Sequence, residues 1–468
     1  MFSNFNSYTN FINSFINKSS NNSEFIKFLE FNINSFLTSP KRKEMIIAEN
    51  YYIGQHDILK RTRTILGKDG SPEVISNLPN NKIVDNQYAR VIDQKNSYLL
   101  SKPITFYSKD SDFSNYINSI LNKNFLKILK DIGEDALNYG ISWLYLFINE
   151  DQQLQFKKFK SYEVLPFWAD EQNTQLDMLV RVYDTQVFKN NYLQSITQVE
   201  LYTLNGIYNF ILSNGKLTPS SSSNFQPYIT DSLNSQFSWS KIPIVSFKSN
   251  SKELPLISKV KSLQDSLNII KSDFMNNMQE DARNTILIIK NYDGTNLAEF
   301  RKNLSEYGAV KVNTIDGSEG GVETLKVDID SSNYELLAKS LKESIIEIAK
   351  GFNSRDSRIS QSPNQMCIQS IYADIDLDAT LMESEFQYSI SYLLFFIKKF
   401  LFVYFNKKFD DSNLDVIFNK DILINESEAI NNCLKSIGII SDELIVSQHP
   451  WVTDLQEELS KKSILSNP

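Results

Sequence analysis

Three long amphipathic helices and one small αβ insert are predicted between Leu254 and Tyr404. The first helix follows Pro255, which suits a first turn because its missing N–H would be unpaired there. Its apolar residues recur in steps of four and three, so they form one stripe along roughly 28 residues, or roughly 40 Å of helix. The stripe consists of Leu256, Val260, Leu263, Leu267, Ile270, Phe274 and Met278.

The second helix begins with the spacing of a capping box, Ser332 followed by Glu335. Two striped helices of similar length are expected to pack on each other or on neighbouring subunits. The second stripe consists of Tyr334, Leu337, Leu341, Ile345, Ile348 and Phe352.

Residues 284–330, between these helices, have the pattern of a compact β-α-β-β insert. Gly308 ends its short helix, and a glycine-rich loop precedes its last strand. The predicted elements are strand Thr285–Lys290, helix Leu297–Tyr307, strand Ala309–Asn313 and strand Val322–Val327. The insert therefore occupies the tip of a helical hairpin.

The third helix follows a polar segment, 353–365, and is expected to be the longest. If unbroken it measures about 60 Å, which greatly exceeds an ordinary globular helix. Its stripe consists of Ile368, Ile371, Ile375, Met382, Phe386, Ile390, Leu393, Ile397, Phe400 and Tyr404. Segment 359–397 has a formal charge of −5, because it contains no Lys or Arg and five acids, Asp374, Asp376, Asp378, Glu383 and Glu385.

Composition excludes several classes of protein. A chain of 468 residues with 41% hydrophobic residues can bury large cores, and two or more domains are expected. Its two cysteines, Cys367 and Cys433, cannot form a disulfide framework and fit a reducing compartment. The net charge of −8 argues against a protein that holds nucleic acid on a basic surface. We expect neither secretion nor a membrane partner, because no signal pattern is present and the apolar stretch Tyr392–Phe405 is short and contains two lysines.

The N-terminal part divides into a helical leader, 1–40, and an αβ region, 41–253. We expect the leader's stripe to pack on a neighbouring subunit or a partner; it consists of Phe25, Phe28, Leu29, Ile33, Phe36 and Leu37. The αβ region is predicted to contain helices Lys43–Tyr52, Tyr88–Leu100 and Phe113–Tyr139 and strand Ile104–Tyr107. The later strands are Ser142–Asn149, Gln153–Phe159, Glu163–Trp168, Asp177–Tyr183, Gln198–Leu204, Ile207–Leu212 and Pro243–Phe247.

Two further segments complete the prediction. Gly215–Gln226, which contains four consecutive serines, is expected to be a surface loop. Residues 409–468 are expected to form short helices, with Ser441 as one N-cap and Thr453 and Gln456 as a second capping box.

Six stretches, in their order and spacing, carry a family resemblance over about Glu49 to Leu459. They are ENYYIGQHDIL at 49–59, LPNNKIVDNQYARVIDQKNSYLLSKPITF at 78–106, LKDIGEDALNYGISWLYLFINEDQQLQFKKFKSYEVLPFW at 129–168, IPIVSFKSN at 242–250, the 256–283 helix leading into ILIIK, and IISDELIVSQHPWVTDLQEEL at 439–459. Here the chain resembles the portal proteins of tailed double-stranded DNA bacteriophages, in the branch with long non-contractile tails. One departure is QSPNQMCIQ at 361–369, where the family usually has a Gly/Ser/Ala-rich approach to the long helix.

The resemblance implies an α+β portal fold and a homo-oligomeric ring of about twelve subunits at one capsid vertex, with double-stranded DNA passing without sequence specificity. The implied parts are a wing (41–253), a stem (254–283 and 331–352), a clip (284–330), a tunnel loop (353–365), a helix from tunnel to wing (366–408) and a crown (409–468). The implied partners are the terminase large subunit, the head-to-tail adaptor, and the scaffold and major capsid proteins. The resemblance implies a virion protein, assembled in the host bacterial cytoplasm, with no cofactor, metal or catalytic residue.

The five acids of the third helix have two interpretations. In a ring, those that face the tunnel would repel phosphates and let DNA slide without a deep energy well. Alternatively, they form a solvated face or pair at a subunit interface with lysines elsewhere.

The tunnel loop has two interpretations as well. The resemblance assigns DNA proximity to Asn353, Ser354, Arg355, Asp356, Ser357 and Arg358. Arg355 and Arg358 would touch phosphates transiently, or would instead pair with Asp356 or the next subunit.

Two other classes stay open: another oligomeric connector or scaffold of a virion, and a metal-dependent enzyme that uses the acids. Asp374, Asp376, Asp378 and Glu385 match positions 1, 3, 5 and 12 of a calcium loop, but Ala379 stands where the turn needs Gly. His56 and His449 are the only histidines and are far apart in sequence. A histidine-based catalytic site therefore has little support, and ATP hydrolysis has none because no phosphate-binding Gly-rich loop occurs.

Overall fold

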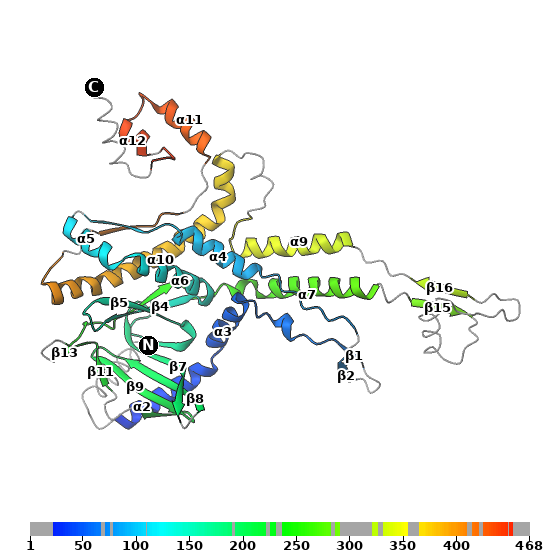
Figure 1. The fold of residues 1–468 in the computed structure, drawn as a ribbon, viewed down its shortest axis with the longest axis horizontal. Coiled ribbons are helices and arrows are strands. Elements are labelled where there is room, and N and C mark those ends of the chain that lie inside the picture. Colours follow the sequence, from blue (N-terminus) through cyan, green and yellow to red (C-terminus); the bar gives the residue numbers. More distant parts are fainter. Residues whose placement is uncertain are drawn as a thin grey trace. The chain divides into compact units, whose positions relative to one another are not determined.

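The computed structural model describes residues 22–66, 71–74, 78–108, 110–189, 192–220, 225–230, 236–281, 286–290, 321–325, 331–353, 365–409, 414–420, 425–447 and 449–452. The chain divides into two compact units (Figure 1). Unit 1 comprises Met1–Gly54, Asn86–Lys261 and Ile345–Pro468, and unit 2 comprises Gln55–Asp85 and Ser262–Ser344.

Side-chain caps set the helix starts in the N-terminal half of unit 1. Ser39 accepts a hydrogen bond from the Arg42 N–H at the start of α3, and Asn122 accepts from two N–H groups at the start of α6. Because Asn122 starts a new helix, the single helix predicted over Phe113–Tyr139 is wrong, and α5 and α6 replace it. The helices are α2 (Asn22–Thr38), α3 (Pro40–Tyr52), α4 (Gln87–Leu100), α5 (Ser111–Ile120) and α6 (Lys123–Tyr139).

Gly140 ends α6 in a conformation that only glycine tolerates there. Its φ is 86°, and a Cβ would lie 2.2 Å from the carbonyl oxygen of Glu253. The chain can therefore turn directly from α6 into β4.

The larger sheet of unit 1 is antiparallel, with the order β10-β9-β8-β7-β6 and with β11 also paired to β9. Its strands are β6 (Val164–Trp168), β7 (Leu176–Lys189), β8 (Tyr192–Tyr202), β9 (Gly206–Ser213), β10 (Lys216–Pro219) and β11 (Phe225–Pro227). Gly215–Gln226, predicted as a loop, therefore includes β10 and the start of β11.

Helix α2 covers one face of this sheet. Phe25, Leu29 and Ile33 are fully buried in one cluster with sheet residues such as Val180 and Leu201. The expectation that this stripe packs on a neighbouring subunit or a partner is wrong, because the chain's own sheet covers it.

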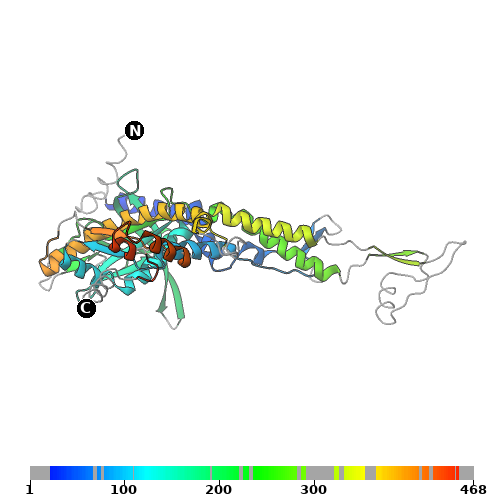
Figure 2. The same ribbon diagram turned by 90° about the horizontal axis from the view of Figure 1, so that it is seen from above.

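Strands β7 and β8 continue past the sheet as a two-stranded arm. β7 pairs with β6 only as far as Arg181, and β8 pairs with β9 only from Thr197 onward. The β7–β8 ladder itself runs out to Lys189 and Tyr192. The predicted strands stopped at Tyr183 and resumed at Gln198, so the sequence prediction missed the arm, which projects from the body in Figure 2.

The second sheet of unit 1 has the order β14-β4-β5, and α6 and α10 lie against it. Its strands are β4 (Ile141–Ile148), β5 (Leu154–Phe159) and β14 (Ile244–Lys248). Two small antiparallel pairs complete the described strands of unit 1: β3 (Thr105–Ser108) with β17 (Leu414–Ile417), and β12 (Ile229–Thr230) with β13 (Gln236–Phe237). The 3-10 turn η2 (Ser161–Glu163) lies between β5 and β6.

Helix α10 (Gln365–Phe405) is continuous over 41 residues, which confirms the predicted long helix. Eight of the ten stripe residues are buried, and Ile371 and Tyr404 are half-buried. The Phe386 and Phe396 rings meet Phe247 and Trp239 edge to face, at 5.1 and 5.8 Å between centroids. Among the described helices, α10 alone has the length and composition of a membrane-spanning segment, a property shared by core helices.

Two short helices follow, α11 (Glu426–Ser436) and α12 (Asp442–Ser447). The Ser441 side chain accepts a hydrogen bond from the Leu444 N–H at 3.4 Å, as predicted for an N-cap. The predicted capping box at Thr453 and Gln456 lies outside the described residues.

Unit 2 contains most of α7 (Ile257–Asp281) and α9 (Ser331–Ile348), which lie side by side (Figures 1 and 2). The Phe274 ring of α7 stacks on the Tyr334 ring of α9 with centroids 3.7 Å apart. β15 (Ile286–Lys290) follows α7, and β16 (Gly321–Leu325) precedes α9; the two strands pair antiparallel. The other elements are η1 (Asp57–Lys60), β1 (Thr64–Leu66) and β2 (Pro72–Val74). The predicted elements Leu297–Tyr307 and Ala309–Asn313 lie outside the described residues.

The stripe predicted for α9 is partly wrong. Ile345 is buried, but Leu337 and Ile348 are about half exposed, and the buried positions beside Ile345 are Ala338 and Ala349. The helix also begins at Ser331, so Ser332 lies inside it rather than at its cap.

One face of α7 buries a ladder of polar side chains that the apolar-stripe analysis did not predict. The ladder residues are four apart: Gln264, Asn268, Ser272 and Asn276. They bind the extended segment 81–85 through four rungs: Asn81 N–H to Asn276 Oδ1 (2.7 Å), Ile83 N–H to Ser272 Oγ (2.9 Å), Asp85 N–H to Asn268 Oδ1 (3.0 Å) and Gln264 Nε2–H to Asp85 O (2.8 Å). Four helical residues rise about 6 Å and two extended residues about 6.6 Å, so the two spacings match.

Candidate functional site

Three of the five acids on α10 face lysines of the same unit. Asp378 lies 2.6 Å from Lys95 Nζ and 3.6 Å from Lys350 Nζ. Lys420 Nζ lies 3.1 Å from Asp376 and 3.4 Å from Glu383. Three carboxylates therefore meet three ammonium groups, and this cluster carries no net formal charge.

Lys95 is the buried centre of that cluster. It projects from α4 with its side chain 7% exposed, and besides Asp378 it donates to the carbonyl oxygen of Ala349 at 2.8 Å. Burial lowers the pKa of Lys95, and the neighbouring Asp378 carboxylate opposes that shift. The ammonium thus joins three segments, because α4 carries Lys95, α10 carries Asp378 and the end of α9 supplies the carbonyl.

Asp376 has a second partner on α4. The Tyr98 hydroxyl donates to Asp376 at 2.9 Å, and burial together with this hydrogen bond raises the pKa of Tyr98. The Tyr98 ring also lies 5.9 Å from the Tyr372 ring. Asp376 is therefore anchored within the unit.

The remaining two acids are placed differently. Asp374 is exposed to solvent in the single chain. Glu385 is half-buried and lines a polar hollow of about 320 Å³ together with Lys248 and Tyr388. Of the five acids, Asp374 is therefore the one that is exposed, and the other four are half-buried.

The segment predicted to touch DNA begins at the C-terminal end of α9. Lys350 has φ 54°, and the Gly351 N–H donates to the Ile346 carbonyl at 2.8 Å, which closes the helix end. The Phe352 ring then stacks on Tyr372 at 4.7 Å, and Asn353 is half-buried. Ser354, Arg355, Asp356, Ser357 and Arg358 lie outside the described residues, and their roles stay predictions.

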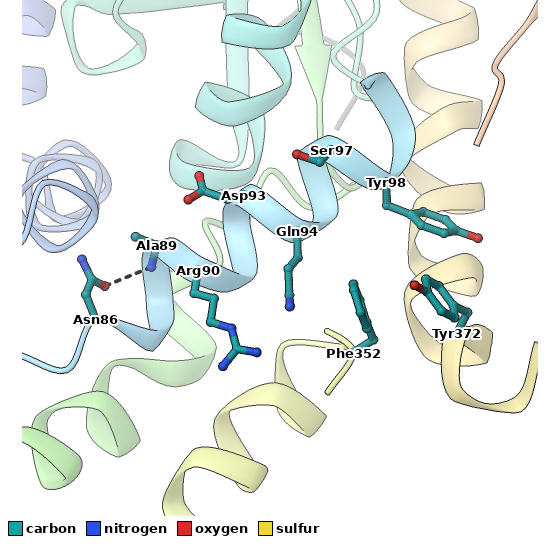
Figure 3. A pocket seen from close by; sticks show the side chains of 9 residues that line it. All are labelled: Asn86, Ala89, Arg90, Asp93, Gln94, Ser97, Tyr98, Phe352 and Tyr372. Atoms are coloured by element: carbon teal, nitrogen blue, oxygen red, sulfur yellow. Dashed lines mark hydrogen bonds between the residues drawn. The ribbon is translucent and has the colours of Figure 1, made fainter. Parts of the chain in front are cut away.

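A groove of about 620 Å³ lies beside this helix end (Figure 3). The Arg90 and Gln94 side chains leave α4 on the side that faces Phe352, and Tyr372 lies beyond that ring (Figure 3). The other lining residues are Asn86, Ala89, Asp93, Ser97 and Tyr98. The groove thus combines an aromatic stack with charged and amide groups.

The lysine partners of the acids were not predicted from the sequence. Lys95 could have been found, since it falls on the buried face of α4 between Val91, Ile92 and Leu99, where an unpaired charge would be costly. Lys350 and Lys420 gave no such signal, because each lies outside a helix and meets the acids only through the fold.

The metal-site alternatives receive no geometric support from the described part of the chain. The four residues of the calcium-loop pattern lie in one continuous helix, so they cannot wrap around an ion as a loop does. Among the described residues, no group of three or more His, Cys, Asp or Glu is placed to hold a metal ion.

Comparison with known proteins extends over nearly the whole chain. Residues 40–462 match the family described as "Phage portal protein, SPP1 Gp6-like". The portal protein of Clostridium phage phiCD119 is 27% identical over 433 residues, covering 89% of this chain and 91% of that protein. The portal protein of Bacillus phage SPP1 is 27% identical over 427 residues, covering 88% of this chain and 81% of that protein. The match includes α10, its lysine partners and the polar ladder of α7, and this chain therefore belongs to the SPP1 Gp6-like family of phage portal proteins.

Proposed function

We propose that this portal protein forms a ring of about twelve subunits at one vertex of the capsid, through which double-stranded DNA enters during packaging and later leaves. As a phage portal protein it is a structural component of the virion and has the DNA-conduit function of its family. The observation that carries the proposal is the family match over residues 40–462, which spans both units of the fold.

The elements support a division of labour along the chain. Residues 41–253 form the wing, and α7 with α9 form the stem within 254–283 and 331–352. Residues 284–330 form the clip. Within this insert, β15, which follows α7, pairs with β16, which precedes α9. Residues 353–365 form the tunnel loop, 366–408 the helix from tunnel to wing, and 409–468 the crown.

The tunnel surface is built from the loop and from part of α10. Pairing within the unit removes much of the charge of Asp376, Asp378 and Glu383, so Asp374 dominates the phosphate-repelling wall. Arg355 and Arg358 contact phosphates transiently as the DNA moves. A wall with few fixed cations binds DNA weakly, as translocation requires.

The partners follow from the conduit function. The clip docks the terminase large subunit during packaging and the head-to-tail adaptor afterwards, and the wing and crown meet the scaffold and major capsid proteins. Assembly takes place in the cytoplasm of the host bacterium.

Electron microscopy of the purified chain tests the ring directly, and a field of monomers or of rings without a central hole would contradict the proposal. Deleting 285–327 behind a short Gly-Ser bridge tests the clip. The shortened chain should still form rings but should neither bind terminase nor attach the adaptor. Normal packaging by that deletion would exclude the clip assignment.

A further inference from the structure

The arm formed by β7 and β8 has the character of an interaction surface. From Tyr183 to Ile196 its two strands pair only with each other, so both outer edges keep backbone N–H and C=O groups that no sheet partner uses in the described residues. A two-stranded ribbon is marginally stable in water by itself, and a free strand edge readily pairs with another chain.

The tip of the arm is apolar, although the rows behind it are polar. Phe188 and Leu193 form a cross-strand pair and are 68% and 64% exposed. Behind them on the same face lie the pairs Gln186–Ser195 and Asp184–Thr197, and only after these does the face enter the core at Val182–Val199. On the opposite face, Val187 and Tyr192 are also exposed. The core of unit 1 therefore does not bury this apolar surface.

The charge of the arm excludes a nucleic-acid partner. In its described part, 183–189 and 192–196, the charged side chains are Asp184 and Lys189, which cancel formally. Phosphate binding requires clustered Lys and Arg. The tip instead fits an uncharged apolar surface of another protein.

This chain exposes a surface of that kind. On α10, between Leu377 and Tyr388, every exposed residue is uncharged: Leu377, Thr380, Leu381, Ser384, Gln387 and Tyr388. A head-to-tail contact that closes a ring needs two different, matching surfaces on each subunit. The arm tip and such an uncharged strip meet that requirement within one sequence.

We propose that the β7–β8 arm docks on a second copy of this chain, with the Phe188–Leu193 pair as its anchor. The inference rests on the ring assembly proposed above, and it identifies a surface that would hold neighbouring subunits together. Burial of the tip removes two large apolar side chains from water and gives the free strand edges a partner.

The test compares tip and control variants of the full chain by mass photometry. The double variant Phe188→Ser with Leu193→Ser should lower the fraction of protein in rings at least tenfold, because it removes the anchor but leaves the strand pairing. The control, Gln186→Ala with Gln194→Ala on the same arm, should assemble as the unaltered chain does. A second variant replaces 185–196 by Asn-Gly between the paired residues Asp184 and Thr197. This shortened chain should give folded monomers whose circular dichroism spectrum matches that of the unaltered chain.

Photo-crosslinking identifies the occupant directly. With benzoylphenylalanine at position 188, the purified chain should give two-chain adducts; with the same probe at exposed Thr218 it should give few. Unaltered ring formation by both arm variants, or absence of two-chain adducts from position 188, would overturn the proposal. If the unaltered chain forms no ring, the conduit proposal fails at that step, and the crosslink still reports separately on the arm.

Discussion

At the scale of single residues, Asp374 and Asp378 show how one sequence pattern covers two different roles. They lie one turn apart on α10 and are the same residue type, yet Asp374 is exposed and Asp378 sits between Lys95 and Lys350. A buried ammonium that loses its carboxylate becomes an uncompensated buried charge. Asp378 therefore stabilises the fold through its lysine partners, whereas the Asp374 side chain is exposed to solvent.

Asp378→Asn should lower the free energy of unfolding by about 3 kcal/mol, because Lys95 then keeps only a neutral partner. The matched substitution Asp374→Asn should change it by less than about 0.5 kcal/mol. Urea unfolding measures both. The double variant Lys95→Met with Asp378→Leu should regain most of the loss, since replacing a whole buried pair by apolar groups is often neutral. Equal effects at the two aspartates would contradict the assignment.

Asp135 on α6 should make stability depend on pH. Burial raises its pKa from 3.8 to about 6, and the neighbouring Lys158 limits the shift. Between these values the folded chain binds a proton that the unfolded chain does not, so this group adds stability as the pH falls. When the pH falls from 7 to 4, the free energy of unfolding of the unaltered chain should rise by on the order of 2 kcal/mol relative to that of Asp135→Asn, measured by urea unfolding. Asp131→Asn, exposed on the same helix, serves as the control and should follow the unaltered chain.

At the scale of elements, α7 explains both the success and the failure of prediction from sequence. Val260 and Leu267 are buried as the apolar period requires, and the helix ends within two residues of its predicted bounds. The polar ladder was missed because Gln264 and Asn276 resemble surface residues until the segment 81–85, far away in sequence, binds them. For the same reason the lysine partners of the α10 acids were missed. Apolar periodicity predicts that a residue is buried, but not which distant residue packs against it.

Asn276 and Asn277 provide a matched test of the ladder. Asn276→Ala leaves the N–H of half-buried Asn81 without its acceptor and should cost about 1 to 3 kcal/mol of unfolding free energy. Asn277→Ala changes an exposed residue of the same helix and should be neutral or slightly stabilising, because Ala is the better helix former. Amide hydrogen exchange at Asn81 should accelerate in the first variant alone. Equal costs for both would mean that the rungs contribute nothing.

At the scale of the whole molecule, a ring multiplies whatever charge each subunit presents to its tunnel. Because intrachain pairs neutralise most of the α10 acids, the electrostatic field in the tunnel depends on few groups. A substitution at one residue per subunit can therefore change that field. Screening by salt is efficient for exposed charges and weak for buried ones. In the proposed tunnel, the balance between solvated and paired acids should therefore set how strongly ionic strength affects translocation.

Asp374→Lys should leave ring assembly intact but slow DNA packaging at low salt, because each subunit then attracts phosphate at an exposed position. Added salt should relieve the defect, and Asp374→Asn should show a smaller one. Packaging rates in a reconstituted motor, measured across a salt series after the rings have been verified by microscopy, provide the readout. Identical rates for all three chains at every salt concentration would contradict the electrostatic account.

The polar ladder of α7 has a consequence for a particle that is being filled. Incoming DNA carries a dense counterion atmosphere, so the ionic surroundings of a portal change as the genome accumulates. The four rungs that hold 81–85 involve only amide, hydroxyl and backbone groups, none of which is charged. Counterions screen ion pairs but barely weaken such neutral contacts. The hold that the four rungs give α7 on this segment should therefore be as firm beside a full genome as beside an empty shell, whereas the Lys271–Asp85 ion pair between the same two elements adds a contribution that salt can screen.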